Sequence, residues 1–131
     1  MDILIGIILG LIIVLSGKVT RFENNRWFYP AILIVIGLLY ILFGIFDGKV
    51  EVIVFETFFA AIFVGAAVAG FKKSLLIAAV GIFLHGVFDV FHNFIIENSG
   101  VPNFYPQFCL AVDFVLAFYL GLTQLTKSRN P

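Results

Sequence analysis

Five side chains that ionise or bind metal ions lie inside long apolar segments: Glu56, His85, Asp89, His92 and Asp113. An ionisable group at the centre of a bilayer costs about 2.5 to 3.5 kcal/mol on insertion scales. Buried acids and imidazoles therefore lose their charge, pair with one another, or bind an opposite charge. A divalent metal ion is the simplest such charge, and imidazole with carboxylate suits zinc, iron or manganese.

The spacing of these residues predicts a common site. His85, Asp89 and His92 stand at positions i, i+4 and i+7, which fall within an arc of about 60° on a helix. We predict that these three residues and Asp113 hold the metal ion, and that Glu56 is the catalytic residue, acting as a general base.

The composition describes the elements that must position this site. The chain has 131 residues, of which 62% are apolar and 12% charged, and its mean hydropathy is +1.13. An ordinary soluble domain has about 25% charged residues, so a soluble globular protein is excluded. Eight basic and eight acidic residues balance, which argues against a nucleic-acid partner.

Crossing a bilayer takes roughly 20 mostly apolar residues in a helix. Five segments meet or approach that length, and they predict one all-α membrane domain, a polytopic bundle of five transmembrane helices. Their expected limits are residues 3–16, 28–46, 52–71, 75–96 and 108–125.

The basic residues orient this bundle, because short cytoplasmic loops hold an excess of lysine and arginine. When five spans alternate, seven of the eight basic residues fall on one side, and only Lys49 falls on the other. This predicts an N-terminus outside, a cytoplasmic C-terminus and a location in the plasma or inner membrane. Glu56, Asp89, His92 and Asp113 then share a layer in the outer half of the membrane, with His85 deeper.

Two readings without a metal ion stay open. In the first, His85 bonds Asp89 or a neighbouring backbone carbonyl, while His92 and Asp113 form an ion pair that locks the fourth helix to the fifth. In the second, the polar layer is a proton or ion path. Cys109 shares a helical face with Asp113, four residues later, and we interpret it as a small apolar packing residue.

Small residues at four-residue spacing let helices approach closely in lipid. Gly6 and Gly10 form one such stripe, and Ala61, Gly65 and Ala69 form another. We interpret both as packing surfaces within the bundle. A homo-oligomer seam is the alternative.

The run L-H-G-V-F-D-V-F-H-N at 84–93, followed by C-L-A-V-D at 109–113, resembles a family of small bacterial integral membrane proteins of unknown function. The family pattern is a membrane glutamate, then His-x3-Asp-x2-His, then Cys-x3-Asp, matched here by Glu56, His85, Asp89, His92, Cys109 and Asp113. Members often have a second histidine where this chain has Asn93. The resemblance implies an architecture and no particular reaction.

Three functions fit these residues. The first is a metal-dependent intramembrane enzyme acting on a lipid or another apolar substrate, with metal-bound water as the nucleophile. The alternatives are a proton-coupled small-molecule carrier and a non-catalytic membrane subunit whose polar layer fixes the helix register. Metal content of the purified protein separates the first function from the other two.

Overall fold

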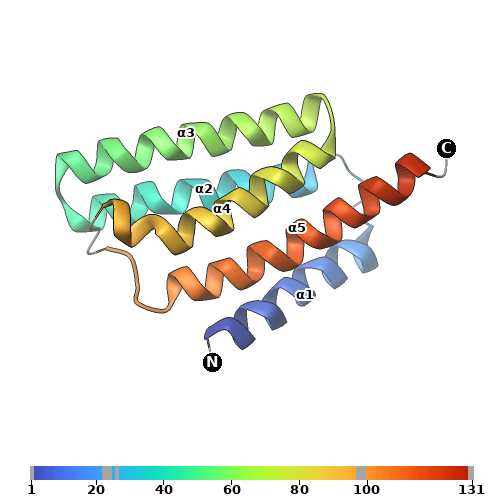
Figure 1. Cartoon of the computed structure of the whole chain (residues 1–131), viewed down its shortest axis with the longest axis horizontal. Coiled ribbons are helices and arrows are strands. Elements are labelled where there is room, and N and C mark those ends of the chain that lie inside the picture. Colours follow the sequence, from blue (N-terminus) through green and yellow to red (C-terminus); the bar gives the residue numbers. More distant parts are fainter. Residues whose placement is uncertain (1, 22–24, 26, 97–99, 130–131) are drawn as a thin grey trace.

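The structure, a computed structural model, describes residues 2–21, 25, 27–96 and 100–129. Within them the chain forms five α-helices and no strand (Figure 1). Each helix is long and apolar enough to cross a bilayer, which confirms the predicted all-helical bundle of five spans and makes this a multi-pass membrane protein. The helices are α1 (Asp2–Thr20), α2 (Phe28–Asp47), α3 (Val50–Lys72), α4 (Leu75–Ile95) and α5 (Tyr105–Arg129).

Local chemistry explains where several helices begin and end. Gly48 follows α2 with a φ of 86°, a left-handed conformation that glycine adopts without strain, and its N–H bonds to the Gly44 carbonyl at 3.0 Å. Ser74 precedes α4 and its Oγ accepts a hydrogen bond from the Leu76 N–H at 3.2 Å. Pro106 stands in the first turn of α5, where a missing N–H does no harm.

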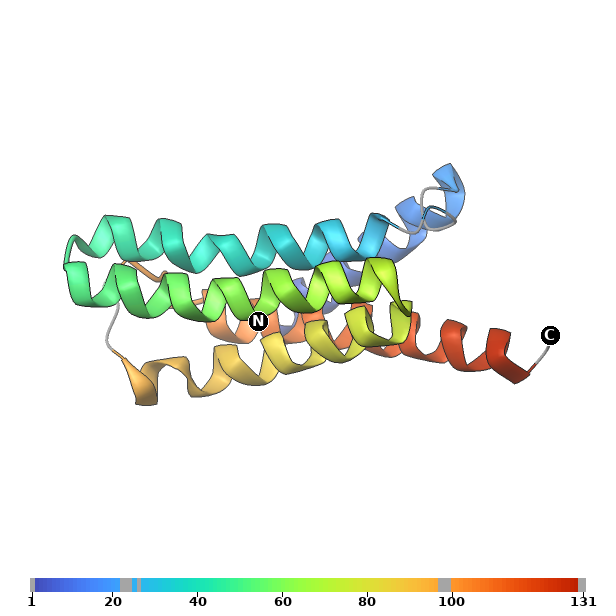
Figure 2. The ribbon, with the colours of Figure 1, turned by 90° about the horizontal axis from the view of Figure 1, so that it is seen from above.

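The central helix of the bundle is α4. It packs against α2, α3 and α5, and Figure 2 shows α2 and α3 side by side with α4 and α5 beneath them. Successive helices run in alternating directions, so the turn between α2 and α3 and the start of α5 lie at the same end of the bundle (Figure 1). Residues near the end of α4 and near the starts of α3 and α5 are therefore at similar depth.

The other end of the bundle carries most of the basic residues in the described part of the chain. Lys18 lies in the last turn of α1, Lys72 lies in the last turn of α3, and Lys73 directly follows α3. Arg26 lies outside the described residues. The side of the membrane that this end faces stays a prediction.

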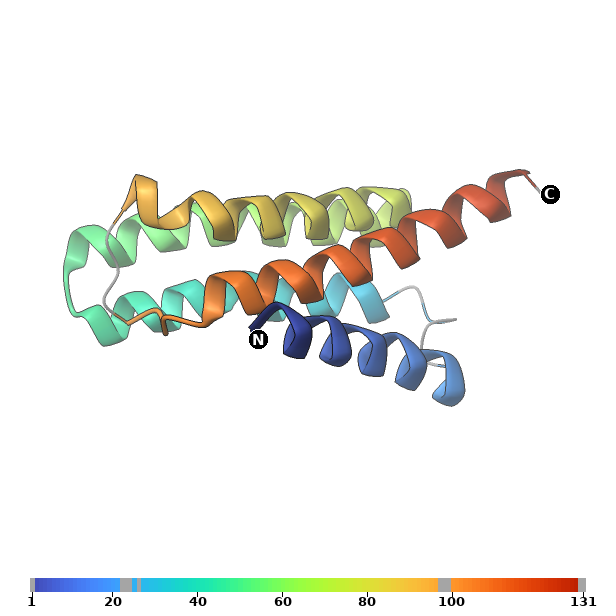
Figure 3. The same cartoon turned by 60° about the horizontal axis from the view of Figure 1, so that its bottom comes forward.

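The outermost helix is α1, which packs mainly against α5 and runs in the same direction (Figure 3). A Cβ atom on Gly6 would lie 2.7 Å from the Ala111 Cβ, and one on Gly10 would lie 2.9 Å from the Val115 Cβ. Both distances are too short for a real side chain, so these glycines are what lets the two helices touch. The packing prediction for this stripe is confirmed.

The stripe on α3 behaves differently. Ala61 and Gly65 are exposed, Ala69 is half-buried, and a Cβ atom on Gly65 would meet nothing within 4 Å. The prediction that these residues pack within the bundle is wrong for Ala61 and Gly65. Residue spacing alone does not show which side of a helix a stripe occupies, and α3 turns a different side toward its neighbours.

Two clusters of buried side chains fill the bundle. The larger is apolar, spans α2 to α5 and includes Leu33, Ile82 and Leu116, all with no exposed surface. The smaller lies near the start of α5 and consists of Tyr40, Phe43, Tyr105 and Cys109. The predicted ionisable residues adjoin this second cluster.

Candidate functional site

All five ionisable side chains predicted to form the site are completely buried, with no exposed surface. The structure brings them together from α3, α4 and α5, as the spacing predicted, but it divides them into two groups. One group surrounds His85 and the other is a single pair formed by His92.

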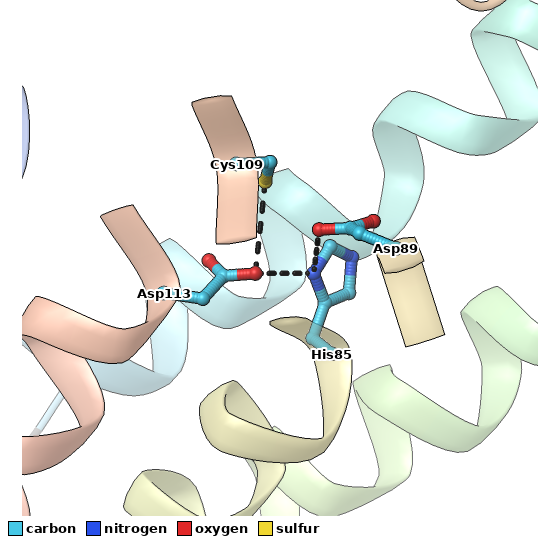
Figure 4. A group of neighbouring side chains, drawn as sticks. All are labelled: His85, Asp89, Cys109 and Asp113. Carbon is cyan, nitrogen blue, oxygen red and sulfur yellow. Dashed lines mark hydrogen bonds and ion pairs between the residues drawn. The ribbon is translucent and has the colours of Figure 1, made fainter. Parts of the chain in front are cut away.

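The first group, here called the His85 cluster, consists of His85, Asp89, Cys109 and Asp113 (Figure 4). The His85 Nδ1 lies 2.8 Å from the Asp113 Oδ2 and 3.4 Å from the Asp89 Oδ2. The Cys109 Sγ lies 3.6 Å from the Asp113 Oδ2. One metal-binding atom from each of the four residues falls within 4.8 Å of all the others.

A close approach of α4 and α5 creates this cluster. His85 and Asp89 are one turn apart on α4, and Cys109 and Asp113 are one turn apart on α5, so each helix presents two adjacent groups. Gly86, which follows His85 on α4, faces α5, and a Cβ atom on it would lie 3.1 Å from the Asp113 Cβ. The glycine in the motif therefore makes room for the Asp113 side chain beside His85.

The second group, here called the His92–Glu56 pair, joins α4 to α3. The His92 Nε2 lies 2.7 Å from one carboxylate oxygen of Glu56 and 2.9 Å from the other. Sequence reasoning had weighed an ion pair between His92 and Asp113. That pairing is wrong, because Glu56 takes the His92 Nε2 and Asp113 bonds to His85 instead.

Tyr40 on α2 stands between the two groups, and sequence reasoning missed it. Its hydroxyl donates a hydrogen bond of 2.5 Å to the Asp89 Oδ1, and its ring stacks on the His92 ring with centroids 4.3 Å apart. A tyrosine well inside an apolar span was the available signal, because a buried phenol needs a hydrogen-bond partner.

Several polar atoms of the two groups are buried without a hydrogen-bond partner among the described residues. They are the His85 Nε2, Asp89 Oδ2, His92 Nδ1 and Asp113 Oδ1. An unsatisfied buried polar atom costs about 1 to 3 kcal/mol, and natural proteins rarely gather several in one place. The two oxygens belong to the His85 cluster, so the cluster retains free capacity to bind a donor or a cation.

Comparison with known proteins places the chain. Residues 1–126 match the model of a family described as "Family of unknown function (DUF6010)". The chain belongs to this family. No curated protein and no solved structure matches it.

The family match covers the residues of both groups. A family of unknown function assigns them no role, so their chemistry must be read from their geometry. The predicted ligand set was His85, Asp89, His92 and Asp113. The group that could hold a metal ion has Cys109 where that set has His92. The ligand role of each residue, and the catalytic role of Glu56, stay predictions.

Proposed function

We propose that this protein binds a divalent transition-metal ion inside the membrane, at the His85 cluster. The observation that carries the proposal is a surplus of acidic groups. Asp89 and Asp113 both contact the same nitrogen of His85, with no exposed surface on any of the three. One imidazole can balance at most one carboxylate, so a second positive charge or a proton is needed in this apolar surrounding.

A divalent ion meets that need. Two carboxylates, a neutral imidazole and a divalent cation have a formal charge of zero while Cys109 keeps its proton, and of −1 when Cys109 binds as a thiolate. Both are smaller in magnitude than the −2 of the two carboxylates without an ion, which suits a site within hydrocarbon. The thiol of Cys109 adds a soft donor that favours zinc or iron over magnesium or calcium.

The distances also fit a metal ion. Ligand atoms at zinc bond lengths stand about 3.3 to 3.6 Å from one another in a tetrahedron. The contacts of Asp89 with His85 and of Cys109 with Asp113 measure 3.4 and 3.6 Å. Of these three contacts, the one between His85 and Asp113, at 2.8 Å, must lengthen by roughly half an ångström.

A metal-dependent enzyme acting on an apolar substrate is the second candidate. The observation that favours it is the state of His92, whose Nε2 is held by Glu56 while its Nδ1 has no hydrogen-bond partner among the described residues. A histidine oriented by a carboxylate in this way presents its other nitrogen as a base or a ligand. In this reading Glu56 orients the base, where the sequence had suggested that Glu56 is the base itself.

Metal analysis of the detergent-purified protein tests the first proposal. We expect about one equivalent of a transition metal per chain, as a four-ligand site requires. His85→Ala and Cys109→Ala should lose the ion. His92→Phe, which preserves an aromatic ring beside Tyr40, should retain it. Purified protein that contains no transition metal and takes up none from solution would refute the proposal.

The absorption of Co²⁺ bound in place of the native metal separates the two candidates. Four protein ligands form a closed site, whereas three leave a position for water or substrate. A charge-transfer band from thiolate to cobalt that disappears in Cys109→Ala indicates the closed site. A cobalt spectrum that Cys109→Ala leaves unchanged indicates an open position and favours the enzyme.

A further inference from the structure

Tyr40 is buried, with 2% of its surface exposed, and its hydroxyl reaches the His85 cluster from α2. The hydroxyl donates to the Oδ1 of Asp89, and the other oxygen of that carboxylate, Oδ2, faces the His85 Nδ1 at 3.4 Å. The Tyr40 hydroxyl therefore determines that the Oδ2 of Asp89, and not its Oδ1, points toward the other metal-binding atoms of the cluster. A hydrogen bond from a neutral donor to a carboxylate is stronger than one between two neutral groups, so this orientation is well held.

The tyrosine ring is itself held on several sides. It stacks on His92 at 4.3 Å with an interplanar angle of 26°. Phe43, Phe88 and Tyr105 meet it edge-on, with centroid distances of 5.8, 5.4 and 5.5 Å. These four aromatic neighbours restrict the movement of the ring and so help to keep its hydroxyl beside Asp89.

The His92–Glu56 pair completes this support. Both carboxylate oxygens of Glu56 lie within hydrogen-bond distance of the His92 Nε2, and this contact holds the imidazole on which Tyr40 stacks. A continuous chain of contacts thus runs from Glu56 on α3, through His92 on α4 and Tyr40 on α2, to Asp89 in the cluster. Through this chain, α2 and α3 reach the cluster although they contribute no residue to it.

We propose that Tyr40 is the positioning residue of the metal site: it holds Asp89 in the orientation that binds the ion, and the His92–Glu56 pair holds Tyr40. This inference rests on the proposed metal-binding function. Residues that hold a metal ligand in place from behind typically change metal affinity by about 10- to 100-fold when they are mutated. Tyr40 contacts only one oxygen of Asp89, so the other stays available to the ion.

The test uses Co²⁺ titration of the full chain in detergent. Tyr40→Phe removes one hydroxyl and keeps the ring. We expect it to raise the Kd for Co²⁺ by about 10- to 100-fold and to change the visible spectrum of the bound ion, because the Asp89 carboxylate is free to turn. Tyr119→Phe, which removes a tyrosine hydroxyl next to the apolar cluster, is the matched control and should change neither the Kd nor the spectrum.

A second variant separates positioning from general loss of stability. Asp89→Asn keeps an amide oxygen that can still bind Co²⁺ weakly, so a Kd is measured at high Co²⁺ concentration even though the purified variant holds no ion. In protein that carries Asp89→Asn, we expect Tyr40→Phe to change this Kd by less than about twofold, because the two side chains act through one contact. This double variant also serves if Tyr40→Phe alone does not fold, since a buried neutral amide that lacks the hydroxyl costs less free energy than a buried carboxylate that lacks it.

Two results overturn the inference. One is an unchanged Kd and spectrum in Tyr40→Phe. The other is an effect of Tyr40→Phe that persists undiminished beside Asp89→Asn. If the wild type binds Co²⁺ and either result is obtained, only the role of Tyr40 is refuted. If the wild type binds no metal ion, the proposed function is refuted.

Discussion

The two histidines of α4 lie on one face of the same helix, but they differ in the number of acidic side chains that contact them. His92 has one acidic partner, Glu56, which contacts its Nε2 with both oxygens. His85 has two acidic partners, Asp89 and Asp113, which share its Nδ1. The His92–Glu56 pair thus has one imidazole for one carboxylate, whereas the His85 cluster has one imidazole for two.

This difference separates a structural contact from a candidate binding site. A pair without surplus acid can act as a clamp between α3 and α4, although the His92 Nδ1 has no hydrogen-bond partner among the described residues. A cluster with surplus acid and a thiol requires a proton or a cation, which makes it the place where a ligand is expected. His85 and His92, two turns apart on one helix, therefore have different roles: one belongs to a candidate binding site and the other to a contact between helices.

The largest expected effect comes from removing an acid of the His85 cluster. Asp113→Ala should abolish metal binding and lower the free energy of unfolding by about 3 to 5 kcal/mol, because it breaks a fully buried pair. Thermal unfolding in detergent and metal analysis measure the two effects. Asp113→Asn, which preserves the size of the side chain, should also lose the ion. Full metal content in either variant would erase the distinction between the two groups.

Breaking the His92–Glu56 pair should destabilise the protein and leave the ion in place. Glu56→Ala removes the partner of His92, and we expect a loss of about 3 kcal/mol as α3 loosens from α4. Metal content should stay at about one equivalent per chain, as a complete ligand set predicts, although the affinity falls if Tyr40 is disturbed. A variant that folds normally but contains no metal would instead make Glu56 a part of the binding site.

Removing the ion by chelation should lower the unfolding temperature of the wild type. Saturation at 100 times the Kd stabilises a protein by about 2.7 kcal/mol, and a chelator removes that amount. The same chelator should have no effect on Asp113→Ala, which has no ion to lose. Equal responses of the two proteins would mean that the metal is bound elsewhere.

The smallest effect is expected at Cys109. Cys109→Ser replaces a soft donor with a hard one, so we expect zinc affinity to fall about tenfold, or roughly 1.4 kcal/mol, and the relative affinity for manganese to rise. Competition titrations with the two ions measure this change. His92→Phe is the matched control and should leave the preference between the ions unaltered; a shift there would assign a ligand role to His92.

Most of the fold could be predicted from the sequence. Hydropathy identifies five spans because a bilayer demands a fixed length of apolar helix, and all five are present. It located the helix ends less well: α1 continues to Thr20 and α5 starts at Tyr105, since helical hydrogen bonding does not stop where an apolar run stops. The stripes around Gly10 and Gly65 look alike in sequence, and only one of them packs against a neighbouring helix.

The candidate site was predicted in outline. The spacing of His85, Asp89 and His92 showed that they share a face of one helix, and the topology brought Glu56 and Asp113 to their depth. The partners could not be deduced, because both acids were within plausible reach of both histidines. The choice depended on how closely α5 approaches α4 at Gly86 and on which face α3 presents.

By itself the sequence determined that this chain crosses a membrane with five helices, and that Glu56, Asp89, His92 and Asp113 lie at similar depth with His85 deeper. Those properties follow from the helical rise per residue and from the length of apolar helix that a bilayer requires. Only the tertiary structure decided that Glu56 belongs to His92, that Cys109 joins Asp113 beside His85, and that Tyr40 links the two groups. The physical reason is that a periodic pattern gives the direction of a side chain about its own helix axis, whereas its partners are set by the rotation and the separation of neighbouring helices.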